Sequence, residues 1–180
     1  CQYAGDGGDG VLPDILVVGK AMAGGFPLSA AIGTAEVMGS WGTSSGEAVH
    51  TSTFLGNPLG CAMATASLEV LVRDDWPQKV REKGAWLTKQ LLALCEEYPH
   101  HLKRVRGRGL MLGMELVDGV DGAPAPLKAL ALMTRCRDQG YLVLPSGIHG
   151  NILALTPPFV ITEEQLEAAL ATLRDILGSL

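Results

Sequence analysis

Lys20 is the residue whose position in this sequence suggests covalent chemistry. It follows the apolar run Ile15–Val18, which predicts a strand buried on both faces in a parallel sheet. The carboxyl ends of such strands are where open α/β sheets bind ligands, and the glycine-rich turn at Gly24-Gly25 leaves room for a bulky group. A lysine with restricted solvation has a lowered pKa and can form a Schiff base with an aldehyde. The alternative is a surface lysine that only ends a strand.

A second candidate is the hydroxyl pair Ser52-Thr53, which lies shortly before a strong helix start. Asn57 can serve as the N-cap, with Pro58 at the first helical position. Hydroxyls before a helix N-terminus suit a phosphate, since the N–H groups and the helix dipole there favour an anion. The alternative is that these hydroxyls only cap the helix.

Composition excludes several other classes of function. The 180 residues are 47% hydrophobic, which is ample for a core, and the net charge of −5 argues against a general nucleic-acid binder. No run of eighteen apolar residues is present, so we expect no membrane span. The four cysteines and four histidines lack the short spacing of a metal site, and scattered thiols favour a reducing cytoplasm.

The order of elements predicts an α/β protein in two parts. Strands are expected at 15–18, 28–32, within 105–117, at 141–144 and at 152–155. Helices are expected from Asn57-Pro58 onward, through 80–94, over 127–139, and after a cap at Thr162. The break at 73–77 marks a boundary, which divides the chain into residues 1–75 and 76–180.

Taken together, four segments resemble the motifs of the class III pyridoxal-phosphate-dependent aminotransferases. Residues 13–28 (PDILVVGKAMAGGFPL) resemble that family's lysine motif, and residues 50–58 match its threonine–aromatic–x–Gly–Asn–Pro motif. Residues 106–116 resemble its small-domain strand, and residues 155–162 its closing motif. The segments occur in the family's order over essentially the whole chain.

The resemblance implies a fold-type I enzyme of which this chain is the C-terminal part. Residues 1–75 would be the end of the large cofactor domain, and 76–180 the small C-terminal domain. Lys20 would hold pyridoxal 5′-phosphate as a Schiff base and later move a proton between the substrate and the cofactor. Thr53, helped by Ser52, would bind the cofactor phosphate of the neighbouring subunit, which implies a homodimer. The substrates implied are a small amino donor and a 2-oxo acid acceptor.

Two departures from the family pattern bear on the reaction. Ala154 stands where many members have an arginine that binds the substrate carboxylate. The family's aspartate for the pyridine nitrogen would lie before Cys1, and the glycine-rich start of the chain suggests a fragment. We therefore expect a transaminase, with an amino-acid or lactam racemase of the same family as the alternative. A non-catalytic fragment is the alternative from another class. Arg106 and Arg108 are left out of the predicted site, because charges at a strand edge explain them equally well.

Overall fold

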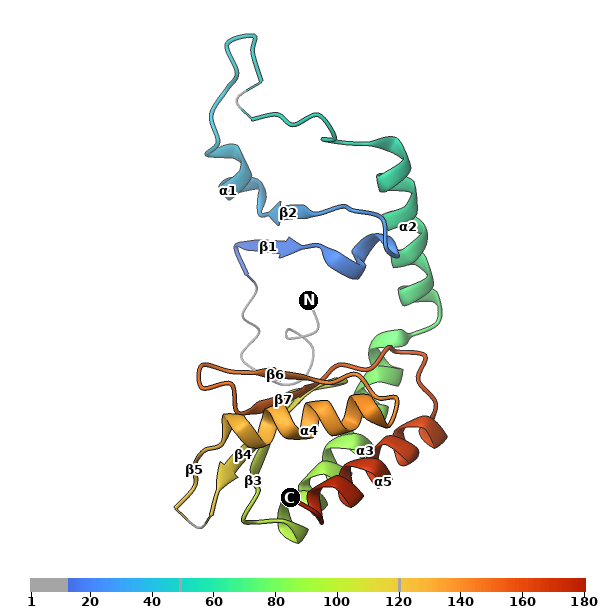
Figure 1. The fold of residues 1–180 in the computed structure, drawn as a ribbon. Coiled ribbons are helices and arrows are strands. Elements are labelled where there is room, and N and C mark those ends of the chain that lie inside the picture. The colour runs from blue at the N-terminus through green and yellow to red at the C-terminus, as the bar shows by residue number, and fades with distance from the viewer. Residues whose placement is uncertain (1–12, 49, 120) are drawn as a thin grey trace. The chain divides into compact units, whose positions relative to one another are not determined.

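The chain folds into two compact units, Cys1–Pro77 and Gln78–Leu180. A computed structural model describes residues 13–48, 50–119 and 121–180 (Figure 1). The glycine-rich start predicted to be a cut end lies outside these residues. Helices and strands occur in both units, which confirms the α/β class. The assignment of residues 1–75 to a cofactor domain stays a prediction, since compactness alone does not show what a unit binds.

The first unit contains a short antiparallel strand pair. Strand β1 (Ile15–Val18) pairs with β2 (Ala30–Gly33), in a register that sets Val18 opposite Ala30. The predicted strand is therefore present, but its predicted parallel pairing and burial are wrong for the described residues. Ile15 is 51% exposed and Val17 is 73% exposed. Apolar side chains on both faces of a strand need two covering layers, and the described part of this unit does not supply them.

The helix predicted after Asn57 begins where its cap signal places it. Helix α2 spans Pro58–Arg73, and the Asn57 side chain accepts a hydrogen bond of 3.0 Å from the N–H of Gly60. Gly60 is buried against the ring of Phe26, where a Cβ would lie 2.9 Å from Cε1. Glycine at this position therefore lets α2 pack closely on the segment that follows Lys20. The sequence did not predict the short helix α1 (Ala35–Gly39), which Thr34 caps.

The sheet of the second unit is antiparallel throughout. Its strands are β3 (Leu102–Arg108), β4 (Met111–Asp118), β7 (Ile152–Leu155) and β6 (Leu144–Ser146), in the order β3-β4-β7-β6, and β5 (Ala123–Pro124) pairs with β4. The strand predicted within 105–117 is therefore part of a hairpin. Its two-residue turn, Gly109-Leu110, has Gly109 at φ 56°, which favours glycine. Strand β6 starts at Leu144, where the predicted strand ends.

Three helices cover one face of this sheet and form the core with it. They are α3 (Trp76–Glu97), α4 (Pro126–Asp138) and α5 (Glu163–Leu177) (Figure 1). Their leucines pack on the strand residues of the same face, which include Leu112, Met114, Leu116 and Leu153. The predicted cap at Thr162 is confirmed, and it forms a complete capping box with Gln165. Among the described residues, no helix combines the length and apolar character needed to cross a bilayer.

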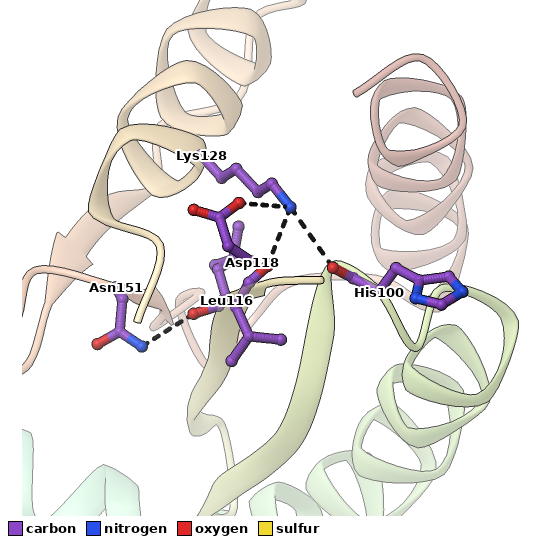
Figure 2. A network of polar contacts seen from close by, with 6 residues as sticks. His100, Leu116, Asp118, Lys128 and Asn151 are labelled. Carbon is purple, nitrogen blue, oxygen red and sulfur yellow. Dashed lines mark hydrogen bonds and ion pairs between the residues drawn. The ribbon is translucent and has the colours of Figure 1, made fainter. Parts of the chain in front are cut away.

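A half-buried lysine ties helix α4 to the end of the hairpin, as Figure 2 shows. Lys128 Nζ lies 2.9 Å from Asp118 Oδ1 and donates to the carbonyl oxygen of Val117 at 3.0 Å. It also donates to the carbonyl oxygen of His100, at 3.4 Å. One ammonium group thus joins α4, the end of β4 and the turn before β3. These contacts fix α4 against the end of the β3–β4 hairpin.

Asn151 fixes the neighbouring strand in the same way, and its loss is expected to be costly. It is 4% exposed, and its Nδ2 donates 2.9 Å to the carbonyl oxygen of Leu116 (Figure 2). We predict that Asn151→Ala lowers the free energy of unfolding by about 1 kcal/mol, because a buried hydrogen bond is lost while the carbonyl oxygen of Leu116 keeps the bond that the N–H of Ala125 donates at 3.2 Å. Urea unfolding measures this. The control is Thr134→Ala, which removes a solvent-facing hydrogen bond to Leu130. Equal costs for the two variants would contradict the prediction.

Candidate active site

Lys20 lies at the carboxyl end of β1, as predicted. It is the first residue of a short 3₁₀ turn, η2 (Lys20–Ala23), and its φ of 51° is in the left-handed region that non-glycine residues rarely adopt. The predicted restriction of its solvation is wrong for the described residues, because the lysine is exposed. A side chain on a strained backbone next to a strand end is a recurring feature of functional sites.

The turn around Lys20 is held by its own backbone. The N–H of Met22 donates to the carbonyl oxygen of Gly19 at 3.1 Å, and the N–H of Gly24 donates to Ala21 at 3.1 Å. Ala23 is fully buried and anchors the turn in the unit. Within the described part of the chain, no hydrogen bond or ion pair engages the Lys20 amine. The backbone is therefore fixed while the amine is available to a ligand.

Ser52 and Thr53 lie in the exposed segment that leads to α2. The N–H of Leu55 donates to the carbonyl oxygen of Ser52 at 3.1 Å, which folds the segment into a turn. The two hydroxyls make no hydrogen bond with another described residue. They do not cap α2, since Asn57 does so, and the Gly60 N–H is therefore already occupied. A phosphate bound here would therefore receive its hydrogen bonds mainly from the two hydroxyls.

The structure attaches the two predicted groups to elements that touch. Lys20 is on η2, and the segment that follows it packs on α2 through Phe26 and Gly60. Ser52 and Thr53 precede the same helix. Among the described residues no direct hydrogen bond joins Lys20 to either hydroxyl. The first unit therefore carries the amine of Lys20 and the two hydroxyls, and these groups are not hydrogen-bonded to one another.

A row of arginines lies in the second unit, and it includes Arg106 and Arg108, which sequence reasoning left out of the predicted site. Arg104, Arg106 and Arg108 occupy alternate positions of the edge strand β3, which places them on one face. Val105 between them packs on the core, so the arginines lie on the face away from the helices. Their alternate spacing within a strand could have predicted from the sequence that the three arginines share one face.

The described cysteines show no sign of chemistry. Cys61, Cys95 and Cys136 are free, and burial raises the pKa of the Cys95 and Cys136 thiols. A raised pKa disfavours the reactive thiolate form. Over the described residues, no group of His, Cys, Asp and Glu is arranged to hold a metal ion.

Comparisons with known proteins place these features in a family context. A family model described as "Aminotransferase class-III" matches residues 2–177. An ornithine aminotransferase of Bordetella pertussis is 40% identical over 171 residues, which are 94% of this chain and 38% of that relative.

Solved structures agree with that match. A phospholyase from Arthrobacter in complex with phosphoethanolamine superposes with a TM-score of 0.86 at 30% identity, over 94% of this chain and 40% of its own. An amine transaminase from an uncultivated Pseudomonas species, in its PLP-bound internal aldimine form, has a TM-score of 0.83 at 30% identity, over 94% and 39%. The chain thus spans about two fifths of the length of these proteins.

Proposed function

This chain belongs to the class III aminotransferase family, and on that premise we propose that it carries the catalytic lysine of a transaminase. The whole protein would move an amino group from an amine or amino acid to a 2-oxo acid. The observation that carries the proposal is Lys20, which stands in a lysine motif at the end of β1 with an exposed amine. The similarity to an ornithine aminotransferase supports the same reaction class.

The groups present fit pyridoxal 5′-phosphate, the proposed cofactor. Its aldehyde needs a primary amine, which Lys20 supplies, and its phosphate needs donors, which Ser52 and Thr53 supply. Gly24 and Gly25 leave open space beside the lysine, since a Cβ at either position would have no neighbour within 4 Å. When bound, this cofactor withdraws electrons from the bond that breaks at the substrate's α-carbon.

In this proposal the Lys20 amine has two roles. Between turnovers its Nζ holds the cofactor covalently. With substrate bound, the Lys20 Nζ would be free to act as the base that moves the proton of the substrate's α-carbon. The hydrogen-bonded turn from Gly19 to Gly24 keeps the backbone of Lys20 in one position, which limits the freedom of the moving amine.

A homodimer is part of the proposal. Ser52 and Thr53 would bind the phosphate at the neighbouring subunit's site, which requires them to lie at an interface. Apolar side chains beside them support this, because Phe54 is 76% exposed, Leu55 is 65% exposed and Leu59 is 61% exposed. Such a patch is typical of a surface that another chain covers. We place the protein in the cytoplasm, since its described cysteines are free thiols.

The alternative with its own supporting observation is an amino-acid or lactam racemase. Ala154, which has no charge to pair with a substrate carboxylate, lies in β7 between Gly113 and Leu144. In a racemase, Lys20 would return the proton to the opposite face of the α-carbon. A similar scaffold also serves a phospholyase, so the family alone does not fix the reaction.

The reaction products after addition of amino donor alone separate these readings. We predict that the whole protein, loaded with cofactor and given amino acid without acceptor, releases about one equivalent of 2-oxo acid per Lys20 and then stops. Chromatography of the quenched mixture measures it. Inversion of the amino acid without any 2-oxo acid would establish the racemase. No reaction of either kind, together with no borohydride fixation of cofactor on Lys20, would support the non-catalytic fragment.

A further inference from the structure

The second unit contains an apolar cavity with a volume of about 250 Å³. Its walls come from α3, α4 and α5 and from the segments that follow α4 and β7. The lining side chains include Leu87, Leu91, Tyr141, Pro157, Ala169 and Leu173. All of these residues belong to one compact unit, and none of them has a part in the proposed function.

Hydrogen bonds hold the walls of the cavity in place. Lys83 of α3 donates to the carbonyl oxygen of Phe159 at 3.1 Å and also to that of Ile161, so it ties the segment before α5 to α3. On the other side, the N–H of Tyr141 donates to the carbonyl oxygen of Cys136 at 2.9 Å. Cys136 lines the cavity and is 1% exposed. The cavity is therefore preformed, as sites for small molecules usually are.

The lining suits an uncharged, apolar molecule better than water. Of the side chains that line the cavity in the described part of the chain, none carries a charge. The hydroxyl of Thr172 donates to the carbonyl oxygen of Ala168 at 3.1 Å and is thereby engaged within α5. A water molecule in a cavity needs about two to four polar partners. Water is therefore held weakly here, and an apolar molecule that displaces it gains affinity.

We propose that this cavity binds an uncharged aromatic molecule of one or two rings. A dry cavity of about 150 Å³ is large enough to admit benzene. The volume of about 250 Å³ therefore has room for a molecule the size of indole. The ring of Tyr141 offers an aromatic partner for such a molecule, and the leucines of α3 and α5 offer apolar contacts. This binding does not depend on the proposed function, so each can fail without the other.

The test uses indole, which is titrated into the whole protein by calorimetry. We expect about one indole to bind per chain, with a Kd below about 1 mM. Ala169→Phe adds a ring at the cavity wall and should weaken binding at least about tenfold, because that ring takes the space of the ligand. The matched control is Ala168→Phe, which makes the same change at the adjacent, exposed position of α5, outside the lining. It should stay within about twofold of the wild type.

A smaller substitution keeps the test decisive if Ala169→Phe does not fold. Ala169→Leu adds less volume, and it should raise the midpoint of urea unfolding because it fills empty space. The inference is overturned if wild-type protein does not bind indole, or if Ala169→Leu lowers the midpoint. It is also overturned if the folded Ala169→Phe and Ala168→Phe variants bind indole equally.

Two further probes test the class of ligand. Indole-3-acetate keeps both rings and adds a carboxylate, and it should bind at least about tenfold more weakly than indole, because burial of its charge is not compensated. The second probe is 1-hexanol, an apolar chain without a ring, which should also bind more weakly than indole, since it cannot pair with the ring of Tyr141. Binding of either probe as tightly as indole would contradict the assignment of an uncharged aromatic ligand.

Discussion

Replacing Lys20 with alanine is expected to lower turnover of the whole protein by at least about a thousandfold, since one side chain both holds the cofactor and moves the proton. Borohydride reduction of the wild type should fix the cofactor on the peptide that contains Lys20, and the variant peptide should stay unlabelled. Mass spectrometry of the digest measures the label, and product formation measures the turnover. Lys20→Arg should be equally inactive, because it keeps the positive charge without the primary amine.

The control for this prediction is Lys89→Ala, which removes an exposed lysine of α3. It should retain the label at Lys20 and the wild-type turnover. Labelling of another lysine in Lys20→Ala, with turnover unchanged, would contradict the role proposed for Lys20.

The Lys20→Ala variant also tests whether two subunits share each active site. If Thr53 binds the phosphate at the neighbouring subunit's site, Lys20→Ala and Thr53→Ala damage different subunits' contributions to one site. After the two inactive proteins are unfolded and refolded together, half of the dimers are mixed and each has one intact site. Activity should therefore return to about a quarter of the wild type. No return would mean that Thr53 serves its own subunit or no site.

Local signals predicted the helix starts and the place of Lys20 at the end of a strand. Asn57-Pro58 and Thr162 mark caps that depend only on residues within one helical turn, and the structure has both caps. The position of Lys20 after a strand was equally local. Its exposure was not, because burial depends on the layers that lie over a strand, and those come from elsewhere in the chain or from other polypeptide.

Whether two strands pair in parallel or antiparallel was harder to predict, because it depends on the length of the segment that connects them. Residues 105–117 were interpreted as containing one strand, although Gly109 gives the turn that makes a hairpin. Only residues 19–29 separate β1 from β2, and parallel pairing of neighbouring strands needs a dozen or more connecting residues. That short connection could have indicated the antiparallel pair. The pairing of β4 with β7 could not be found this way, since Gly113 and Ala154, which lie opposite each other, are about forty residues apart in the chain.

The turn between β3 and β4 packs against helix α3. Gly84 of this helix lies against the backbone of Gly109, where a Cβ would stand 2.3 Å from the carbonyl oxygen and 2.5 Å from the Cα. Real Cβ atoms do not approach backbone so closely. Because Gly109 itself has a φ of 56°, the turn cannot shift without changing its type.

We therefore predict that Gly84→Ala destabilises the protein by about 1–2 kcal/mol. Alanine favours a helix interior by about 1 kcal/mol over glycine, but overpacking against backbone costs about 1–3 kcal/mol or more and cannot be relieved by a change of rotamer. Urea unfolding measures the difference. The control is Gly178→Ala, where the added Cβ would lie at an ordinary 3.5 Å from the carbonyl oxygen of Arg174, and it should leave the stability nearly unchanged. If Gly84→Ala is as stable as Gly178→Ala, then α3 does not hold the turn.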